Sequence, residues 1–133
     1  MMKEILAIVG PTAVGKTAIG IKLAKKYGEV GLVVDGKTPV DAIKVPFEDL
    51  DCLLFMTINA GFSGQAFDSA KLEKVNTVRA QTSIPIEVDG GISDQTIKIA
   101  KQAGATRFIS TSFLFGQNNP EEQYRKLQQL VNS

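Results

Sequence analysis

The chain has 133 residues, of which 44% are hydrophobic and 22% are charged, and its formal net charge is +1. These values are typical of one globular domain with its own core. A nearly neutral chain lacks a broad positive surface for nucleic acid or anionic lipid, and no apolar stretch reaches membrane-spanning length. We therefore expect one cytoplasmic domain over residues 1–133, with neither nucleic-acid nor membrane partners.

Histidine is absent, and Cys52 is the single cysteine. Mechanisms that need a histidine base or a histidine metal ligand are therefore excluded for this chain alone. A disulfide within the chain is excluded as well.

Strand and helix patterns alternate along the whole chain. Short apolar, β-branched runs predict strands at 4–9, 31–34, 52–58, 84–88 and 106–110. Helical periodicity, capping residues and glycine stops predict helices at 15–27, 40–44, 68–81, 93–103 and 119–131. Such alternation indicates a parallel sheet with right-handed crossovers.

The first predicted strand leads into Gly10-Pro11-Thr12-Ala13-Val14-Gly15-Lys16-Thr17. This run fits the spacing of a phosphate-binding loop between a strand and a helix. Its backbone amides would cradle phosphate, Lys16 would reach the β- and γ-phosphates, and Thr17 would hold Mg²⁺. The next position cannot supply a further threonine ligand, because the residue there is Ala18. The alternative is a strand-to-helix turn that merely uses glycines.

Residues 3–28 resemble the start of tRNA dimethylallyltransferases, through the run from Ile8 to Thr17. The stretch Val33-Val34-Asp35 extends this resemblance, which implies a catalytic role for Asp35.

Residues 29–132 resemble the C-terminal half of ribulose-phosphate 3-epimerases, a TIM-barrel family. The segments that carry this resemblance are 38–40, 55–65 and Glu87-Val88-Asp89-Gly90-Gly91-Ile92. It implies that Asp89 is one of two acid–base residues and that Met56 lines the substrate. It also implies that backbone amides hold the sugar phosphate, around Gly61, Gly64, Gly90, Gly91 and the turn at 110–112.

The first half of that family supplies two histidines, the other catalytic aspartate and the remaining metal ligands, and none of these is present here. The family's metal site therefore cannot form in its usual way. Two resemblances that meet near residues 28–31 predict a chimera, natural or engineered, of a phosphate-loop unit (1–28) and four half-barrel units (29–133).

For the fold we expect a five-stranded parallel sheet in a three-layer sandwich with the flavodoxin-like order 2-1-3-4-5, because this order covers both faces of the sheet with helices. The first predicted helix has apolar residues for this purpose, namely Ala18, Ile21, Leu23 and Ala24. The alternative is a half TIM barrel in sequential order that dimerises through its bare face.

For the function we expect a phosphate- or nucleotide-binding domain without evolved catalysis, binding ATP, ADP or inorganic phosphate, with Mg²⁺ on Thr17 and Asp35 and no zinc. The alternative is an enzyme, either a weak nucleotide hydrolase or a residual epimerase-like sugar-phosphate catalyst, with Asp89 and Asp35 as candidate catalytic residues. A hydrolase would also need a cationic side chain, for which Arg79 and Arg107 are the candidates. We expect a monomer, with a homodimer as the alternative.

Overall fold

The computed structural model describes residues 16–59 and 65–133. The predicted strand at 4–9, residues 10–15 of the predicted phosphate loop, and Gly61 and Gly64 lie outside the described residues. The elements follow in the order α1 (Lys16–Tyr27), β1 (Gly31–Val34), η1 (Val40–Ala42), η2 (Phe47–Asp49), β2 (Cys52–Met56), η3 (Ser69–Lys71), α2 (Leu72–Arg79), β3 (Ile86–Asp89), α3 (Ile97–Gln102), β4 (Arg107–Ile109), α4 (Ser112–Phe115) and α5 (Pro120–Asn132).

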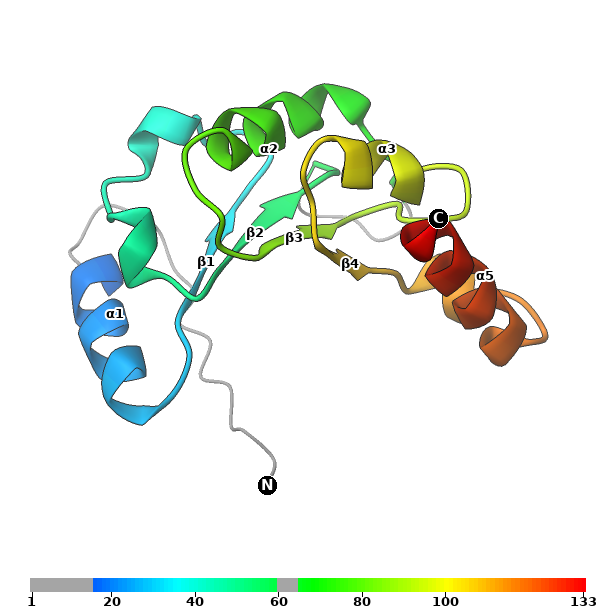
Figure 1. Ribbon diagram of the computed structural model, residues 1–133, viewed down its shortest axis with the longest axis horizontal. Coiled ribbons are helices and arrows are strands. Elements are labelled where there is room, and N and C mark those ends of the chain that lie inside the picture. Colours follow the sequence, from blue (N-terminus) through cyan, green and yellow to red (C-terminus); the bar gives the residue numbers. More distant parts are fainter. Residues whose placement is uncertain (1–15, 60–64) are drawn as a thin grey trace.

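The described strands form a four-stranded parallel sheet in the order β1-β2-β3-β4 (Figure 1). Val34 of β1 lies opposite Phe55 of β2, which in turn lies opposite Val88 of β3. The prediction of a parallel α/β sheet is thus confirmed, and four of the five predicted strands fall within the described residues.

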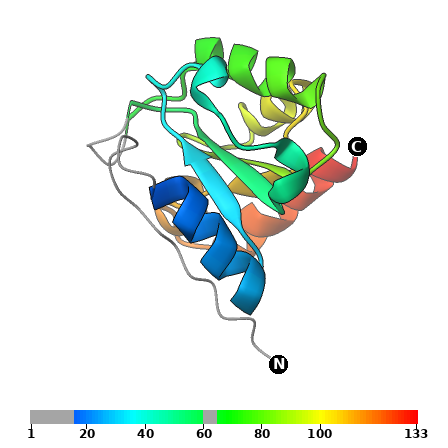
Figure 2. The same ribbon diagram turned by 90° about the vertical axis from the view of Figure 1, so that its left-hand side faces the viewer.

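The predicted order 2-1-3-4-5 is wrong, because it places the strand at 4–9 between 31–34 and 52–58. In the structure β1 and β2 pair directly along the whole of β1, from Gly31 opposite Cys52 to Val34 opposite Phe55. The prediction assumed that both sheet faces need a helical layer. Instead, the described helices follow one arc around the outer side of a curved sheet, from α1 through α2 and α3 to α5 (Figures 1 and 2). The sequential order matches the half-barrel alternative.

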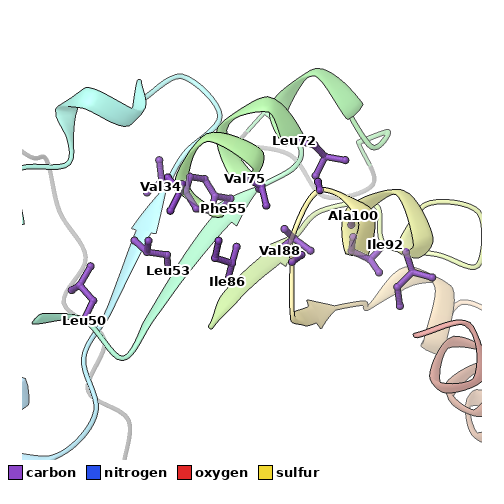
Figure 3. Packing of buried hydrophobic residues seen from close by; sticks show 14 of the residues in the cluster. Val34, Leu50, Leu53, Phe55, Leu72, Val75, Ile86, Val88, Ile92 and Ala100 are labelled. Atoms are coloured by element: carbon purple, nitrogen blue, oxygen red, sulfur yellow. The ribbon is translucent and has the colours of Figure 1, made fainter. Parts of the chain in front are cut away.

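The hydrophobic core lies between the sheet and the helices of this arc (Figure 3). Alternate residues of the two central strands point into it and are at most 2% exposed: Leu53, Phe55, Ile86 and Val88. Leu72, Val75 and Val78 of α2 cover them, together with Ile97 and Ala100 of α3. Each large side chain buried in this way contributes about 1.5–3 kcal/mol relative to an exposed one.

The opposite side of the sheet is less well covered, and we call it the concave face. Its residues are the other members of the same alternation, namely Leu54, Met56, Glu87 and Asp89, which are half-buried, and Val33, which is 60% exposed. The concave face therefore combines apolar side chains with carboxylates.

The last helix begins where the sequence predicts. Pro120 opens α5, and the side chain of Asn119 accepts a hydrogen bond from the backbone N–H of Glu122 at 3.2 Å. The predicted helix at 93–103 is shorter, since α3 begins at Ile97, and Gly104 follows it with a φ of +110°. Within 16–59 and 65–133, no helix is both long and apolar enough to cross a membrane.

Candidate functional site

The carboxyl ends of the parallel strands meet at one edge of the sheet, where open and closed α/β folds bind their ligands. Four chain segments gather there: 35–38 after β1, Thr57 after β2, the turn at 89–91 and Ser110 after β4. This edge is therefore the candidate site.

Asp89 is the last residue of β3 and belongs to the concave face. The sheet register places it between Met56 of β2 and Ile109 of β4. Burial raises the pKa of the Asp89 carboxyl above its ordinary value of 3.8. A carboxyl group in this position keeps its proton to a higher pH than a solvated one, which suits proton transfer.

The turn after Asp89 requires glycine at both of its positions. Gly90 and Gly91 have φ values of +127° and +67°, a region that other residues rarely adopt. A Cβ atom on Gly91 would lie 2.7 Å from the backbone nitrogen of Phe67. The turn is therefore packed directly against the segment before η3, and this packing fixes where Asp89 ends its strand.

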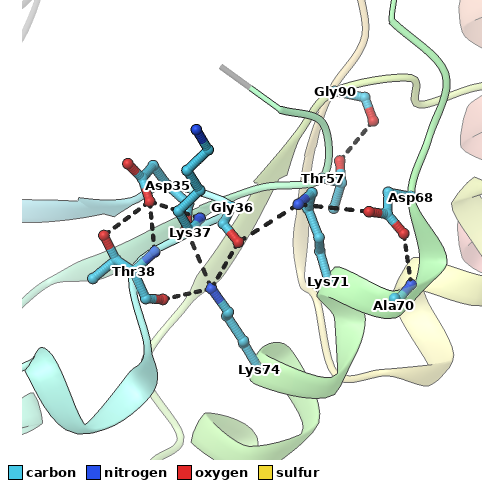
Figure 4. Close-up of polar contacts among 10 residues, drawn as sticks. All are labelled: Asp35, Gly36, Lys37, Thr38, Thr57, Asp68, Ala70, Lys71, Lys74 and Gly90. Atoms are coloured by element: carbon cyan, nitrogen blue, oxygen red, sulfur yellow. Dashed lines mark hydrogen bonds and ion pairs between the residues drawn. The ribbon is translucent and has the colours of Figure 1, made fainter.

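Thr57 anchors this turn, and the sequence analysis did not single it out. It is fully buried, and its hydroxyl donates to the carbonyl oxygen of Gly90 at 2.6 Å (Figure 4). Its backbone N–H donates to the carbonyl of Asp89 at 2.8 Å, and its own carbonyl accepts from Asp68 N–H at 2.8 Å. The sequence does contain a signal for this role: Leu53, Phe55 and Thr57 occupy alternate positions that point into the core, and Thr57 is the polar one among them.

The turns after β3 and β4 are also joined to each other. The hydroxyl of Ser110 donates to the carbonyl of Ile92 at 2.7 Å, and that of Thr96 donates to the carbonyl of Gly91 at 2.8 Å. Backbone amides in two adjacent, fixed turns are the kind of group that binds phosphate oxygens.

Asp35 lies at the same edge, but its carboxylate serves its own loop. One oxygen accepts from the backbone N–H groups of Lys37 and Thr38 and from the Thr38 hydroxyl, at 2.7–2.8 Å (Figure 4). These hydrogen bonds, led by the one from the Thr38 hydroxyl, lower the pKa of Asp35. Lys74 fixes the loop from α2, with its Nζ 2.5 Å from the carbonyl oxygen of Thr38 and 3.0 Å from that of Gly36. Asp35 is thus built to stay ionised and to shape the loop.

The two predicted arginines are not brought to this edge. Arg79 donates to the carbonyl oxygens of Thr82, Ile84 and Gly104 at 2.9–3.0 Å, and these belong to the connections that enter β3 and β4. Arg107 is the first residue of β4, at the opposite edge of the sheet. Neither side chain is therefore placed to neutralise charge on a ligand at the candidate site.

The predicted cofactor ligands at the start of the first helix are only partly described. Lys16 and Thr17 open α1, and their side chains lie outside the part that the structure describes. Position 18 cannot supply a threonine ligand, because the residue there is Ala18, which belongs to α1 and has no hydroxyl group that could bind a metal or a phosphate.

The family resemblance raises the question of a metal ion. The chain has no histidine, and the described residues contain no group of three or more Cys, Asp or Glu side chains that could hold a metal. The described residues therefore do not fit a metal centre by themselves.

Comparison with known proteins places this geometry in a family. A model of the "Ribulose-phosphate 3 epimerase family" matches residues 8–115. Ribulose-phosphate 3-epimerase of Bacillus subtilis is 37% identical over 106 residues, which cover 74% of this chain and 49% of that protein. The enzyme of Aquifex aeolicus is 35% identical over 117 residues, which cover 84% and 53%. The chain thus spans about half the length of these relatives.

The fold is also found among solved structures. A chain of the Amycolatopsis orientalis BexX/CysO complex superimposes with a TM-score of 0.69 at 19% identity, covering 89% of this chain and 47% of the other. At this identity the likeness shows the fold alone, and again it involves about half of the larger chain.

These matches correct the predictions made for residues 1–28. The family match extends from residue 8 to residue 115 and so includes 10–17 and the predicted junction at 28–31, which makes the prediction of a chimera wrong. The same match overturns the predicted phosphate loop and the predicted engineered, non-catalytic nucleotide-binding domain. The loop was predicted because its spacing is short, and a strand-to-helix turn that contains glycines can have the same spacing. With a match from residue 8 to residue 115, the chain belongs to the ribulose-phosphate 3-epimerase family.

Proposed function

We propose that this chain binds a pentulose phosphate and that Asp89 exchanges the proton on C3 of the sugar. The relatives are named for changing the configuration of ribulose phosphate at C3. This carbon is adjacent to the C2 carbonyl, so that loss of its proton gives an enediolate whose charge is shared with the carbonyl oxygen. The proposed chemistry therefore begins with a base close to C3.

The position of Asp89 is the observation that carries the proposal. It is a half-buried carboxyl group at the carboxyl end of a barrel-type strand, between Met56 and Ile109 on the concave face. Catalytic residues of barrel enzymes occupy this kind of position. The raised pKa brings the carboxyl closer to working pH, which favours a group that must accept a proton and return it.

The fixed turns beside Asp89 support the phosphate end of the proposal. The turn at 89–91 is held by Thr57, and the turn at 110–112 is joined to it through Ser110 and Ile92. We assign the sugar phosphate to these turns and the apolar part of the sugar to Met56. No step is assigned to a metal ion, because the described residues do not fit one.

The test is hydrogen exchange at C3. D-Ribulose 5-phosphate is incubated with the chain in D₂O, and loss of the C3 proton signal is followed by NMR. We expect exchange above the buffer rate, and Asp89→Asn should lower the enzymatic rate at least about a hundredfold, within the range for general acid–base groups. Asp41→Asn, an exposed carboxylate on η1, is the matched control and should leave the rate unchanged. Equal rates for Asp89→Asn and the wild type would refute the proposal.

A further inference from the structure

We propose that Lys126 of α5 is a positioning residue, which sets how the two turns assigned to the sugar phosphate lie relative to each other. It does so through contacts with Asp94 and Phe113, and we call these three residues the clamp. The inference rests on the proposed function for the identity of the ligand, whereas the clamp itself rests on contacts between described residues.

The segment 91–96, which follows β3, is closed on itself by Thr96. The Thr96 hydroxyl oxygen accepts from the backbone N–H of Ser93 at 2.9 Å, and the hydroxyl donates to the carbonyl oxygen of Gly91 at 2.8 Å. Asp94 belongs to this closed segment. A contact that holds the Asp94 side chain therefore also holds the backbone amides on either side of it.

The turn at 110–112 leads directly into Phe113 of α4, whose ring is partly buried and packs against the hydrophobic core. The Ser110 hydroxyl donates to the carbonyl oxygen of Ile92 at 2.7 Å and joins this turn to the segment 91–96 at one point. Beyond the paired ends of β3 and β4, a second point of attachment is needed to fix the orientation of the two turns.

Lys126 supplies that second point. Its ammonium group forms an ion pair with the Asp94 carboxylate, and its Nζ lies 5.9 Å from the centre of the Phe113 ring, within the range of a cation–π contact. One side chain of α5 thus contacts a residue from each of the two segments. The side chains of Lys126 and Asp94 are 54% and 26% exposed, and so accessible an ion pair adds little to stability. Its effect is therefore expected in the placement of the turns.

The helix that carries Lys126 is anchored independently of the clamp. Leu127 is buried in the core, and Leu130 and Val131 pack against the same cluster. Lys101 of α3 donates to the carbonyl oxygen of Val131 at 2.5 Å, and α5 lies beside α3 (Figure 1). α5 should therefore stay docked when Lys126 is replaced, and in the native chain it is a fixed support for the clamp.

Direct contact of Lys126 with the phosphate is a different role, and it predicts the opposite effect of a change at Asp94. If Lys126 bound the phosphate itself, Asp94→Asn would release its ammonium group and remove a nearby negative charge, so that binding would become tighter. In the clamp, Asp94→Asn breaks the ion pair and loosens the segment 91–96, so that binding becomes weaker. The sign of the change in affinity separates the two roles.

The first experiment measures the binding of D-ribulose 5-phosphate and of inorganic phosphate by calorimetry. Lys126→Met and Asp94→Asn should each raise the dissociation constant about fivefold or more, in the lower range of coupling within one interaction network. The double variant should bind no more weakly than either single variant, and Lys126→Arg should restore most of the affinity. Circular dichroism verifies that the variants are folded.

Arg125→Met is the matched control, because it removes the same charge from the neighbouring position of α5. The ion pair of Arg125 with Glu121, at 2.5 Å, joins two residues of one helix and touches neither turn. The affinity of Arg125→Met should therefore equal that of the wild type. Equal affinities for Lys126→Met and Arg125→Met, or tighter binding by Asp94→Asn, would overturn the inference.

The second experiment separates the clamp from the proposed chemistry. In the C3 exchange assay Lys126→Met should raise KM and leave kcat unchanged, because Asp89 is untouched. Backbone amides at 92–96 and 110–113 of the ligand-free chain should exchange with D₂O faster in Lys126→Met than in Arg125→Met.

The outcomes of this experiment distinguish the two proposals. An unchanged KM and unchanged amide exchange in Lys126→Met would overturn the clamp and leave the role of Asp89 standing. If Asp89→Asn exchanges the C3 proton as fast as the wild type while Lys126→Met still weakens phosphate binding, the chemical role is overturned and the clamp stands. A wild type that binds neither phosphate compound would overturn the clamp as a phosphate-positioning device, whatever its C3 exchange.

Discussion

Replacement of Thr57 by valine tests whether one buried hydroxyl holds the catalytic turn in place. The two side chains have nearly the same shape, so the change replaces the hydroxyl by a methyl group and leaves little else altered. In the native chain this hydroxyl donates to the Gly90 carbonyl at 2.6 Å, and both residues are buried. In Thr57→Val that carbonyl loses its donor at a place that water does not reach easily.

The expected cost follows from this burial. A buried polar group left without its hydrogen bond costs about 1–3 kcal/mol, which exceeds the net value of about 1 kcal/mol for an ordinary hydrogen bond. The backbone hydrogen bonds from Thr57 to Asp89 and from Asp68 to Thr57 remain, so β2 and β3 stay paired. The free energy of unfolding should therefore fall by about 2 kcal/mol without loss of the fold.

Urea denaturation followed by circular dichroism measures this change. For a small domain with a slope of about 2 kcal/mol per M, the midpoint should fall by about 1 M. Thr57→Ser keeps the hydroxyl and removes a methyl group, and so it should restore C3 proton exchange better than valine does. If Thr57→Val unfolds at the wild-type midpoint and exchanges the C3 proton at the wild-type rate, the assignment of Thr57 as the anchor of the turn is refuted.

Three further results are expected. Gly91→Ala should lower both the stability of the chain and its binding of D-ribulose 5-phosphate, since the φ of Gly91 is +67° and a Cβ atom there would lie 2.7 Å from the backbone nitrogen of Phe67. Gly104→Ala, which introduces strain at the other edge of the sheet, is the control: thermal denaturation should show lower stability, and calorimetry should show unchanged binding. Asp89→Asn should raise the free energy of unfolding at neutral pH, because burial raises the native pKa above 3.8 and the wild type loses stability as pH rises through this window; an advantage that persists below pH 3.8 would contradict this reasoning. Asp35→Ala should show the opposite dependence, because hydrogen bonds lower the native pKa of Asp35; its loss of stability should be complete above pH 3.8 and should shrink as pH falls, which urea titrations at a series of pH values would measure.

Periodicity and capping residues were sufficient to predict the local elements. The run at 52–58 shows alternating burial through β2 to Thr57, and α5 begins at Pro120, close to the predicted start at 119. The order of the strands was not predictable in this way. The predicted order assumed that helices cover both faces of the sheet, and the pattern of a single strand does not show whether each of its faces is covered by a helix. The pairing of Gly31 with Cys52 was needed to decide between the two orders.

The family resemblance drew attention to Met56 and Asp89, which lie side by side on the concave face, and their roles belong to the proposal. Thr57 was missed because its place in the site rests on a single contact. The prediction failed at 10–17, where eight residues satisfied a general pattern that a strand-to-helix turn also satisfies. Asp35 shows a third case. The sequence analysis offered it as a catalytic residue or a magnesium ligand, and only the hydrogen bonds from Lys37 and Thr38 show how its carboxylate is used in the loop.

The alternation within β3 links the fold to the proposed chemistry. Ile86 and Val88 are fully buried, whereas Glu87 and Asp89 between them are only half-buried. In a three-layer sandwich a helix would cover the second pair as tightly as the first, and enclosing two carboxylates from one strand in an apolar layer costs several kcal/mol unless each is paired. Glu87 has Arg107 as its register neighbour on β4, but Asp89 has Ile109. Because neither described strand beside it offers Asp89 a charged neighbour, its carboxyl group argues against a second helical layer and for a lumen that admits water or a polar ligand, which is the environment where Asp89 can reach a sugar.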